Sequence, residues 1–293
     1  MSPDQFLEQF CGFMRSIGNS EATVKSRRGD VRGLITWCEA HHDSPFDLQR
    51  FASEDIPHYR DWLFSRFKIT TANRRLTSLN LILKWAVTNR LVKRQDFQGL
   101  RHRSHPDHPQ SIRHVLDSDA QARFVESVRA SGNARALVAM KLMIDCGLRV
   151  SELCALKSED VKIRSDRGTV SLPVSKSRKP IDIPLPGETC KLLSNFLKSK
   201  AASSNAHLLQ VRSGPISRRA IAKMVDKYGR NAGLENLTPK ILRRTFIMNL
   251  VRSGVDPTII AMLAGNELTE LARRYGSIRL SRCPAESLLS KIN

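Results

Sequence analysis

The chain of 293 residues carries 48 lysines and arginines against 28 aspartates and glutamates, which gives a formal net charge of +20. Its length fits two domains, and its hydrophobic content of 41% is enough for packed cores and excludes wholesale disorder. No segment reaches the ~18–20 continuous apolar residues of a membrane span, and the amino-terminal stretch lacks the basic-then-apolar order of a secretory signal. We therefore expect a protein of the cytoplasm with no membrane partner.

The excess of positive charge is spread over both halves of the chain. Residues 1–105 hold 17 basic and 11 acidic side chains, and residues 106–293 hold 31 and 17. This distribution is typical of a protein that surrounds a polyanion with most of its length. A role in solubility alone is the plainer alternative, but a surplus this large favours nucleic acid, without choosing between DNA, RNA and the ribosome.

Residues 1–98 are predicted to form a helical domain. Apolar residues recur at helical spacing in four segments, at Phe6, Phe10, Phe13 and Ile17, then from Val24 to Trp37, around Ile56–Phe67, and over Thr71–Thr88. Gly18-Asn19-Ser20 supplies a helix stop followed by a serine cap. Arg74, Arg75 and Lys84 add basic charge to the last helix, which indicates either a solvated face or a face laid on DNA.

Residues 99–112 have no apolar periodicity and are predicted to be a linker, with Arg101 and Arg103 placed to touch phosphates. Three histidines in and around it are spaced three apart, but prolines interrupt any helix and no cysteine or carboxylate shell lies nearby, so we expect no metal site. The six cysteines of the chain form no CxxC pair and are predicted to be reduced and mostly buried: Cys11, Cys38, Cys146, Cys154, Cys190 and Cys283.

Residues 113–293 are predicted to form a second, mixed domain. A helix leads into Cys146-Gly147-Leu148-Arg149, and alternating apolar residues at 170–174 and 181–185 then indicate a β-hairpin. Pro173 and Pro184 are expected at a sheet edge or near strand ends. The chain from Thr189 onward is predicted to be helical, with Thr238-Pro239 as a helix start.

Four stretches of this second domain carry candidate chemistry, and each has an ordinary explanation when taken alone. Arg149 and Glu152 fit a surface pair one helical turn apart, and Lys176 fits a solvated turn. Arg243 and Arg244 fit a basic helix face. Tyr275 fits a core tyrosine.

Taken together and in order, the four stretches closely resemble the tyrosine recombinase (phage integrase) family. The first is Gly147-Leu148-Arg149-Val150-Ser151-Glu152-Leu153; the second has Lys176, Lys179 and Pro184-Leu185; the third is Pro239-Lys240-Ile241-Leu242-Arg243-Arg244-Thr245-Phe246; the fourth is Leu263-Ala264-Gly265-Asn266, with Tyr275 nine residues later. Both the residue types and the spacing match the family's pattern. The resemblance covers essentially the whole second domain and, less distinctly, the first.

Two positions of the site depart from the family's usual pattern. Lys240 stands where the family most often has histidine, and Asn266 stands where it has histidine or tryptophan. Arg244 also replaces a second histidine. Lys240 keeps a group that carries a proton, whereas the amide of Asn266 donates a hydrogen bond and does not titrate. The departures affect the assignment of proton transfers rather than the type of reaction.

The resemblance implies a site-specific DNA recombinase that cuts and rejoins strands through a covalent 3′-phosphotyrosine at Tyr275. Arg149 and Arg243 would hold the non-bridging phosphate oxygens, assisted by Lys240 and Asn266. Lys176 would protonate the leaving 5′ oxygen. Glu152 would orient the arginines. The covalent intermediate keeps the bond energy, so we expect no metal, nucleotide or other cofactor.

The resemblance also implies a mainly α fold with a small antiparallel sheet or hairpin, closing on DNA as a two-domain C-shaped clamp. Contacts to double-stranded DNA at attachment or core sites are expected from residues of both domains: Arg74, Arg75, Lys84, Arg101, Arg103, Lys179 and Arg244. Family members act as tetramers that pass through a Holliday junction. The tail with Leu288, Leu289 and Ile292 resembles the segment that docks on a neighbouring protomer, although packing within its own chain is the simpler alternative.

Within the family we expect a compact phage or mobile-element integrase without an arm-binding domain, working in a bacterial host cell and nucleoid-associated when bound. Host DNA-bending and excision-directing proteins are possible partners of such an enzyme. A chromosome-dimer-resolving Xer-type enzyme is the alternative inside the family. A type IB topoisomerase shares the chemistry, and a catalytically silent DNA-binding protein is the rival from another class.

Overall fold

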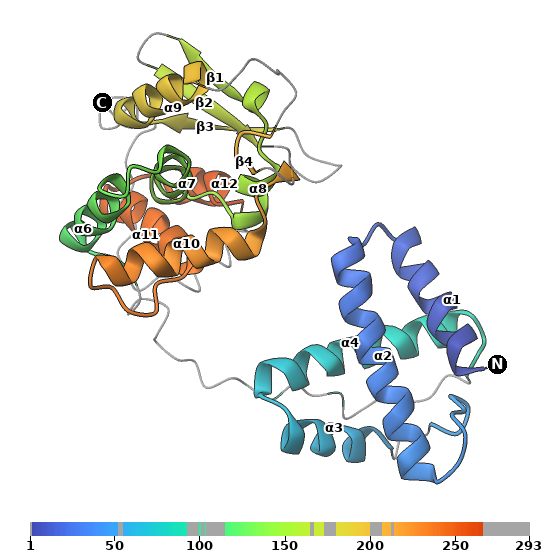
Figure 1. Cartoon of the computed structure of the whole chain (residues 1–293). Coiled ribbons are helices and arrows are strands. Elements are labelled where there is room, and N and C mark those ends of the chain that lie inside the picture. The colour runs from blue at the N-terminus through green and yellow to red at the C-terminus, as the bar shows by residue number, and fades with distance from the viewer. Residues whose placement is uncertain are drawn as a thin grey trace. The chain divides into compact units, whose positions relative to one another are not determined.

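The chain divides into two units, residues 1–108 and residues 109–293 (Figure 1). Each unit has its own hydrophobic core. The computed structural model describes residues 2–51, 55–92, 100, 103, 115–164, 167–172, 180–199, 207–211 and 214–265. The division falls inside the segment expected to be a linker. Each unit is described below by itself.

The described part of the first unit is helical, as the sequence predicted. Its helices are α1 (Pro3–Ser16), α2 (Glu21–His42), α3 (Asp55–Arg66) and α4 (Ile69–Thr88). The predicted serine cap is present, because Ser20 accepts a hydrogen bond from the backbone N–H of Thr23 at 3.2 Å. Ser2 and Gln5 cap α1 reciprocally.

Aromatic side chains from α1 and α4 form the centre of the first core. Phe6 and Phe10 are fully buried and each meets the ring of Trp85 edge-on, at 5.6 and 5.5 Å between centroids. The expectation that Ile17 continues the apolar stripe is wrong. Ile17 is the C-cap of α1 and is 52% exposed, because the helix ends one residue before it.

Two described residues of the predicted linker are attached to the first unit. Leu100 packs against the first core. The backbone of Arg103 exchanges hydrogen bonds with the side chain of Asn73 at 2.8 and 3.1 Å, and its guanidinium lies 4.4 Å from the ring centroid of Phe64. Leu100 and Arg103 therefore belong to the first unit, and the three linker histidines lie outside the described residues.

The second unit combines helices with two small antiparallel sheets. The elements in its described residues, in chain order, are α6 (Ser118–Arg129), α7 (Ala134–Asp145), α8 (Val150–Ala155), η1 (Ser158–Asp160), β1 (Val161–Arg164), β2 (Arg167–Leu172), β3 (Ile181–Leu185), α9 (Gly187–Ser199), β4 (Gln210–Val211), β5 (Gly214–Pro215), α10 (Arg218–Asn231), α11 (Pro239–Arg252) and α12 (Pro257–Leu263). The mainly α fold class with a small antiparallel sheet is confirmed.

The predicted hairpin is part of a three-stranded sheet in the order β1-β2-β3. Val170 of β2 pairs with Ile183 of β3. Pro184, also on the outer strand β3, pairs with Thr169 of β2. Pro184 therefore lies on an edge strand, where its missing N–H is tolerated. Pro173 and the hairpin turn lie outside the described residues. The expectation of helices alone after Thr189 is wrong, since β4 and β5 pair there; strands of two residues are too short to show a periodic pattern.

Polar caps and buried thiols in the second unit follow the prediction. Thr238 caps α11 and Pro239 is its first residue. Cys146 and Cys190 are 0 and 1% exposed, and the five cysteines in the described ranges are free thiols. Burial raises the pKa of the Cys146 thiol well above its ordinary value. In the same ranges, no helix combines the length and apolar character required to cross a bilayer.

Candidate active site

A sharp turn after α7 places Arg149 at the start of α8. Gly147 adopts a left-handed conformation with φ of 63°, which lets the chain reverse between the two helices. A Cβ on Gly147 would overlap the ring of Phe246, with Cε1 and Cγ only 2.7 Å away. The first motif thus needs glycine for two reasons, its backbone conformation and its contact with α11.

Substituting Gly147 by alanine is expected to destabilise the chain by ~2–5 kcal/mol, because overpacking adds to the cost of a left-handed alanine. Gly132→Ala is the matched control, since Gly132 has φ of 66° and nothing within 4 Å of an added Cβ. The control should lose only ~1–2 kcal/mol. Denaturant unfolding of both variants measures the difference, and equal losses would show that the Phe246 contact carries no cost.

Hydrogen bonds fix both the backbone N–H and the guanidinium group of Arg149. Its backbone N–H donates to Glu152 Oε2 at 2.6 Å, and its Nη1 donates to Glu152 Oε1 at 2.7 Å. Its Nη2 donates to the carbonyls of Ala264 and Gly265 at 3.1 and 3.0 Å. The side chain is still 41% exposed, so the guanidinium is held in one orientation at the surface of the unit.

Arg243 reaches the same place from α11. Its guanidinium donates to the carbonyls of Gly147 and Ala264, and its Nη1 lies 3.9 Å from Glu152 Oε2. The side chain is 15% exposed. Three separate segments of the sequence therefore meet: the turn at Gly147, helix α11, and the end of α12.

Glu152 is the acidic group common to both arginines. Two guanidinium groups close together repel each other, and a carboxylate between them offsets that repulsion. Glu152 is 21% exposed on its side chain, so it faces the arginines more than the solvent. This geometry agrees with an orienting role.

Lys240 and Arg244 lie on α11 beside Arg243. Lys240 is an exposed residue of the first turn, three positions before Arg243, where the helix N-terminus favours negatively charged ligands. Arg244 is half-buried. Among the other predicted site residues, Lys176, Lys179, Asn266, Tyr275 and Arg101 lie outside the described residues.

The predicted DNA contacts of the first unit have different environments. Lys84 is exposed on α4. The side chain of Arg74 is 40% exposed, whereas that of Arg75 is 18% exposed and its guanidinium lies 4.0 Å from the ring centroid of Phe67. Both arginines approach Asp30, a buried carboxylate that the sequence analysis did not single out. Its signal was an acidic residue four positions before Leu34, a member of the apolar stripe of α2.

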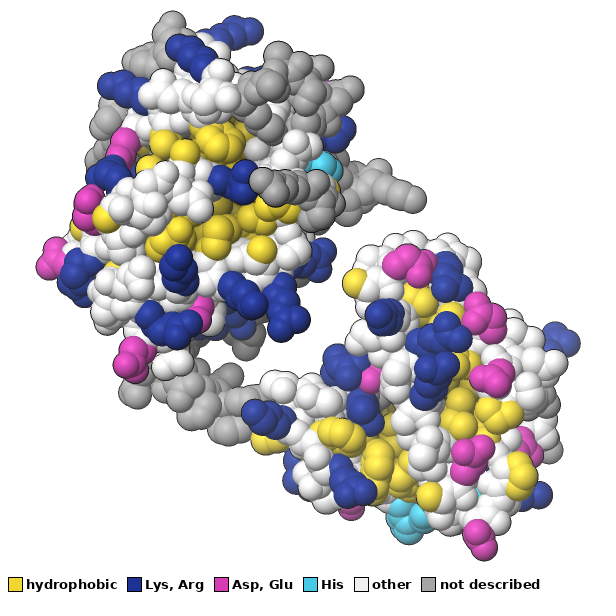
Figure 2. Space-filling view, viewed as in Figure 1, with side chains coloured by type: hydrophobic (Ala, Val, Ile, Leu, Met, Phe, Trp, Pro, Cys, Tyr) yellow, Lys and Arg dark blue, Asp and Glu magenta, His cyan; other side chains and the backbone are white. Residues whose placement is uncertain are grey.

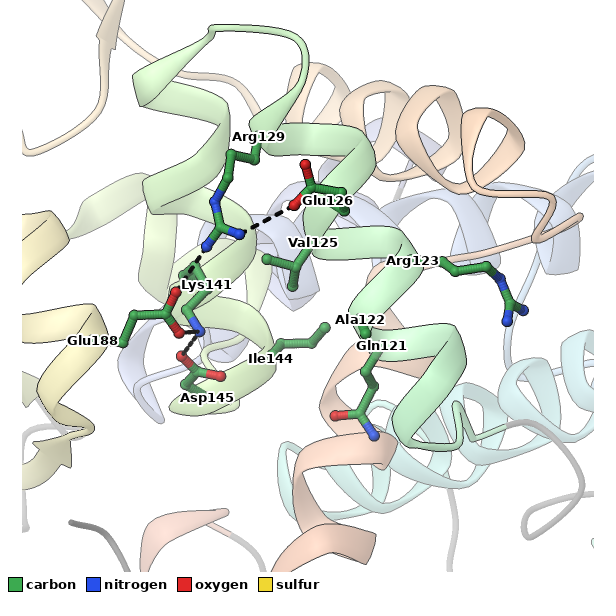
Figure 3. A pocket seen from close by; sticks show the side chains of 10 residues that line it. All are labelled: Gln121, Ala122, Arg123, Val125, Glu126, Arg129, Lys141, Ile144, Asp145 and Glu188. Carbon is green, nitrogen blue, oxygen red and sulfur yellow. Dashed lines mark hydrogen bonds and ion pairs between the residues drawn. The ribbon is translucent and has the colours of Figure 1, made fainter.

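A separate hollow of about 570 Å³ lies between α6, α7 and the start of α9 (Figure 3). Lys141 contacts Asp145 and Glu188 at 2.9 Å each, and Arg129 contacts Glu188 at 2.8 Å and Glu126 at 3.1 Å. Burial alone would lower the pKa of Lys141. Its two carboxylate neighbours outweigh burial, so the pKa lies above its ordinary value. Cations and carboxylates line the hollow in equal number, so it offers no excess charge for a phosphate.

Two solved structures share the fold of this chain. The structure is similar to that of XerH site-specific recombinase bound to a palindromic difH substrate in a post-cleavage complex, with a TM-score of 0.75 and 15% identity over 95% of this chain and 82% of that one. It is also similar to a lambda integrase tetramer bound to a Holliday junction, with a TM-score of 0.66 and 15% identity over 91% of this chain and 78% of that one. These likenesses show that the chain shares the fold of these two proteins.

The family follows from the sequence profile of the phage integrase family, which matches residues 114–280. The chain belongs to this family, and the resemblance inferred from the four motifs is confirmed. A curated relative is the tyrosine recombinase XerC of Corynebacterium efficiens, 27% identical over 287 residues that cover 94% of this chain and 87% of the relative.

Proposed function

We propose that this chain is a site-specific DNA recombinase that cleaves and rejoins strands through a covalent 3′-phosphotyrosine at Tyr275. The observation that carries the proposal is that Arg149, at the start of α8, and Arg243, on α11, converge. Both contact Glu152 of α8, and both donate to the carbonyl of Ala264 at the end of α12. Two fixed guanidinium groups form a fork-shaped receptor for the non-bridging oxygens of a phosphodiester. Stabilising the charge that develops on those oxygens is the main task in phosphoryl transfer.

The burial of the other tyrosines supports Tyr275 as the nucleophile. The chain has three tyrosines. Tyr59 is 1% exposed in the first core, where burial raises the pKa of its phenol, and Tyr228 is 3% exposed in the second core. A DNA phosphate does not reach a side chain enclosed in a core. Tyr275 also stands at the family's interval of nine residues after Asn266.

The test of this function is a covalent adduct on a nicked duplex whose cleaved end diffuses away. The full chain is incubated with this substrate in EDTA and without nucleotide, and denaturing electrophoresis separates adduct from free DNA. We expect an adduct whose phosphopeptide contains Tyr275. Specific DNA binding without any adduct would instead favour the catalytically silent binder and overturn the proposal.

Strand exchange between two duplexes distinguishes a recombinase from a topoisomerase that uses the same chemistry. The lambda integrase neighbour is described as a tetramer on a Holliday junction, and this supports tetramer formation on DNA here. Products joined from two labelled duplexes are the expected outcome; relaxation of supercoils alone would favour the topoisomerase.

Two biological roles are compatible with the family: integration of phage or mobile-element DNA, and Xer-type resolution of chromosome dimers. The notable departures at Lys240 and Asn266 favour a phage or mobile-element integrase. The curated relative named XerC matches nearly the full chain, and this favours an Xer-type resolvase. An attachment-like repeat beside the gene would support integration, and a single chromosomal site near the replication terminus would support the Xer-type alternative.

Specific binding is expected to need both units, since each carries a basic surplus and together they would form a clamp on the duplex. A fragment of residues 113–293 contains the second core. We expect it to lose most specific affinity while keeping weak binding that falls steeply with salt. Fluorescence anisotropy on specific and random duplexes measures both. Undiminished specific binding by the fragment would remove the first unit from recognition.

A further inference from the structure

We propose that Asp30 is a positioning residue that fixes Arg74 as a contact to a backbone phosphate of the bound DNA. The proposal rests on the proposed function and concerns the seam where α2 packs on α4. Figure 2 shows lysine and arginine side chains gathered over the region where these two helices cross. Asp30 is a residue of α2 that contacts Arg74 of α4, and its side chain is 2% exposed.

Three arginines approach the single carboxylate of Asp30. Arg74 Nη1 donates to Asp30 Oδ2, Arg75 Nε lies 3.8 Å from Oδ1, and Arg27 Nη1 lies 4.0 Å from Oδ2. Ser78 Oγ also donates to Oδ2 at 2.5 Å. A buried carboxylate is costly unless it is paired, but one arginine already neutralises it. The surplus of two positive charges is more than burial of Asp30 requires.

Two of the three arginines, Arg75 and Arg74, differ in their exposure to solvent. Arg75 is 18% exposed and rests on the ring of Phe67, and a Cβ at Gly33 would come within 3.0 Å of its Nη1. Arg75 is thus enclosed between helices and neutralises Asp30 from inside. Arg74 is 40% exposed and belongs to the surface.

Hydrogen bonds hold both the guanidinium group and the backbone of Arg74. Its Nη1 donates to Ser26 Oγ at 3.1 Å as well as to Asp30, and its backbone carbonyl accepts a hydrogen bond from Arg27 at 3.0 Å. A long side chain normally loses rotamer freedom when it binds a ligand, which weakens binding. Because Asp30 and Ser26 have already fixed this side chain, that loss is largely made before DNA arrives. Asp30 itself is too deeply buried to meet the phosphates.

A double-mutant cycle on the full chain tests the proposal through DNA affinity at fixed salt. Asp30→Asn is expected to weaken specific binding by about threefold to tenfold. In the Arg74→Ala background the same change should have no further effect, because the residue it positions is gone. Arg74→Ala alone should also lower the slope of log affinity against log salt by about 0.9.

The control for net charge is Asp61→Asn. Asp61 is a surface carboxylate of the same unit, 59% exposed and paired with Arg60 at 3.1 Å. Its loss adds the same positive charge and should leave affinity unchanged or raise it slightly. Asp30→Asn also removes a negative charge, which by itself would strengthen DNA binding. The weaker binding expected for this variant is therefore not explained by the change of net charge.

Where Asp30→Asn fails to fold, as judged by circular dichroism, Asp30→Glu takes its place in the cycle, since it keeps the buried negative charge but moves the carboxylate from the position that holds Arg74. Equal losses of affinity in both backgrounds would assign Asp30 a structural role only and overturn the proposal. A gain of affinity, or an Arg74→Ala variant that binds like the wild type, would also overturn it. Absence of specific binding by the wild type would contradict the proposed function instead.

Discussion

Replacing Tyr275 by phenylalanine is expected to abolish the covalent adduct while leaving specific DNA binding within about twofold of the wild type. The reaction forms a bond between the phenolic oxygen and phosphorus, and phenylalanine removes only that oxygen. The cationic surroundings of Arg149 and Arg243 favour the phenolate of a nearby tyrosine, and no such gain is available to phenylalanine. Gel shift and adduct formation on the nicked duplex measure the two quantities separately.

The matched control is Tyr228→Phe, which removes a phenolic oxygen from the second core. That oxygen accepts a hydrogen bond from Ser131 at 3.2 Å, so its loss should cost about 1 kcal/mol of stability and leave adduct formation intact. If Tyr275→Phe still becomes linked to DNA, the nucleophile is misassigned. If Tyr228→Phe loses the adduct at a temperature where it is folded, the burial argument fails.

Local signals were sufficient to predict the helices and their caps. Ser20 and Thr238 each precede a helix and accept a backbone N–H three residues later, so the feature read from the sequence is the feature that stabilises the helix start. Ile17 shows the limit of the same reasoning. Its spacing fits the stripe of α1, but the backbone leaves the helix there, and periodicity alone does not contain the position of a helix end.

The members of the arginine centre and the place of Glu152 beside them were predictable, but their contacts with backbone carbonyls were not. The motif spacing identified Arg149 and Arg243 because each occupies a defined place in its motif. Their convergence on the carbonyl of Ala264 depends on the packing of α8, α11 and α12 in space. Backbone acceptors of this kind leave no trace in residue type. Asp30 escaped notice for a related reason, since its three arginine neighbours come from two helices.

Substituting Lys176 by alanine is expected to slow cleavage by ~10²–10⁴-fold, the usual range for loss of a general acid, with Tyr275 and DNA binding retained. Lys176 lies outside the described residues, and its assignment rests on its place before Lys179 and Pro184-Leu185. Lys240 is the competing donor, because it is exposed on the first turn of α11 three residues before Arg243. Single-turnover cleavage of the nicked duplex by Lys176→Ala and Lys240→Ala measures both deficits.

A substrate with sulfur at the bridging 5′ position separates an acid from a phosphate contact. A thiol has a pKa of about 8.5, so it leaves as a thiolate without receiving a proton. On this substrate Lys176→Ala should recover to nearly the wild-type rate. Arg149→Ala should stay impaired, because in the proposed function its guanidinium, fixed by Glu152, stabilises charge on the non-bridging oxygens. If sulfur rescues Lys240→Ala instead, Lys240 is the acid and Lys176 only contacts a phosphate. If it rescues neither lysine variant, Lys176 is likewise assigned to phosphate contact.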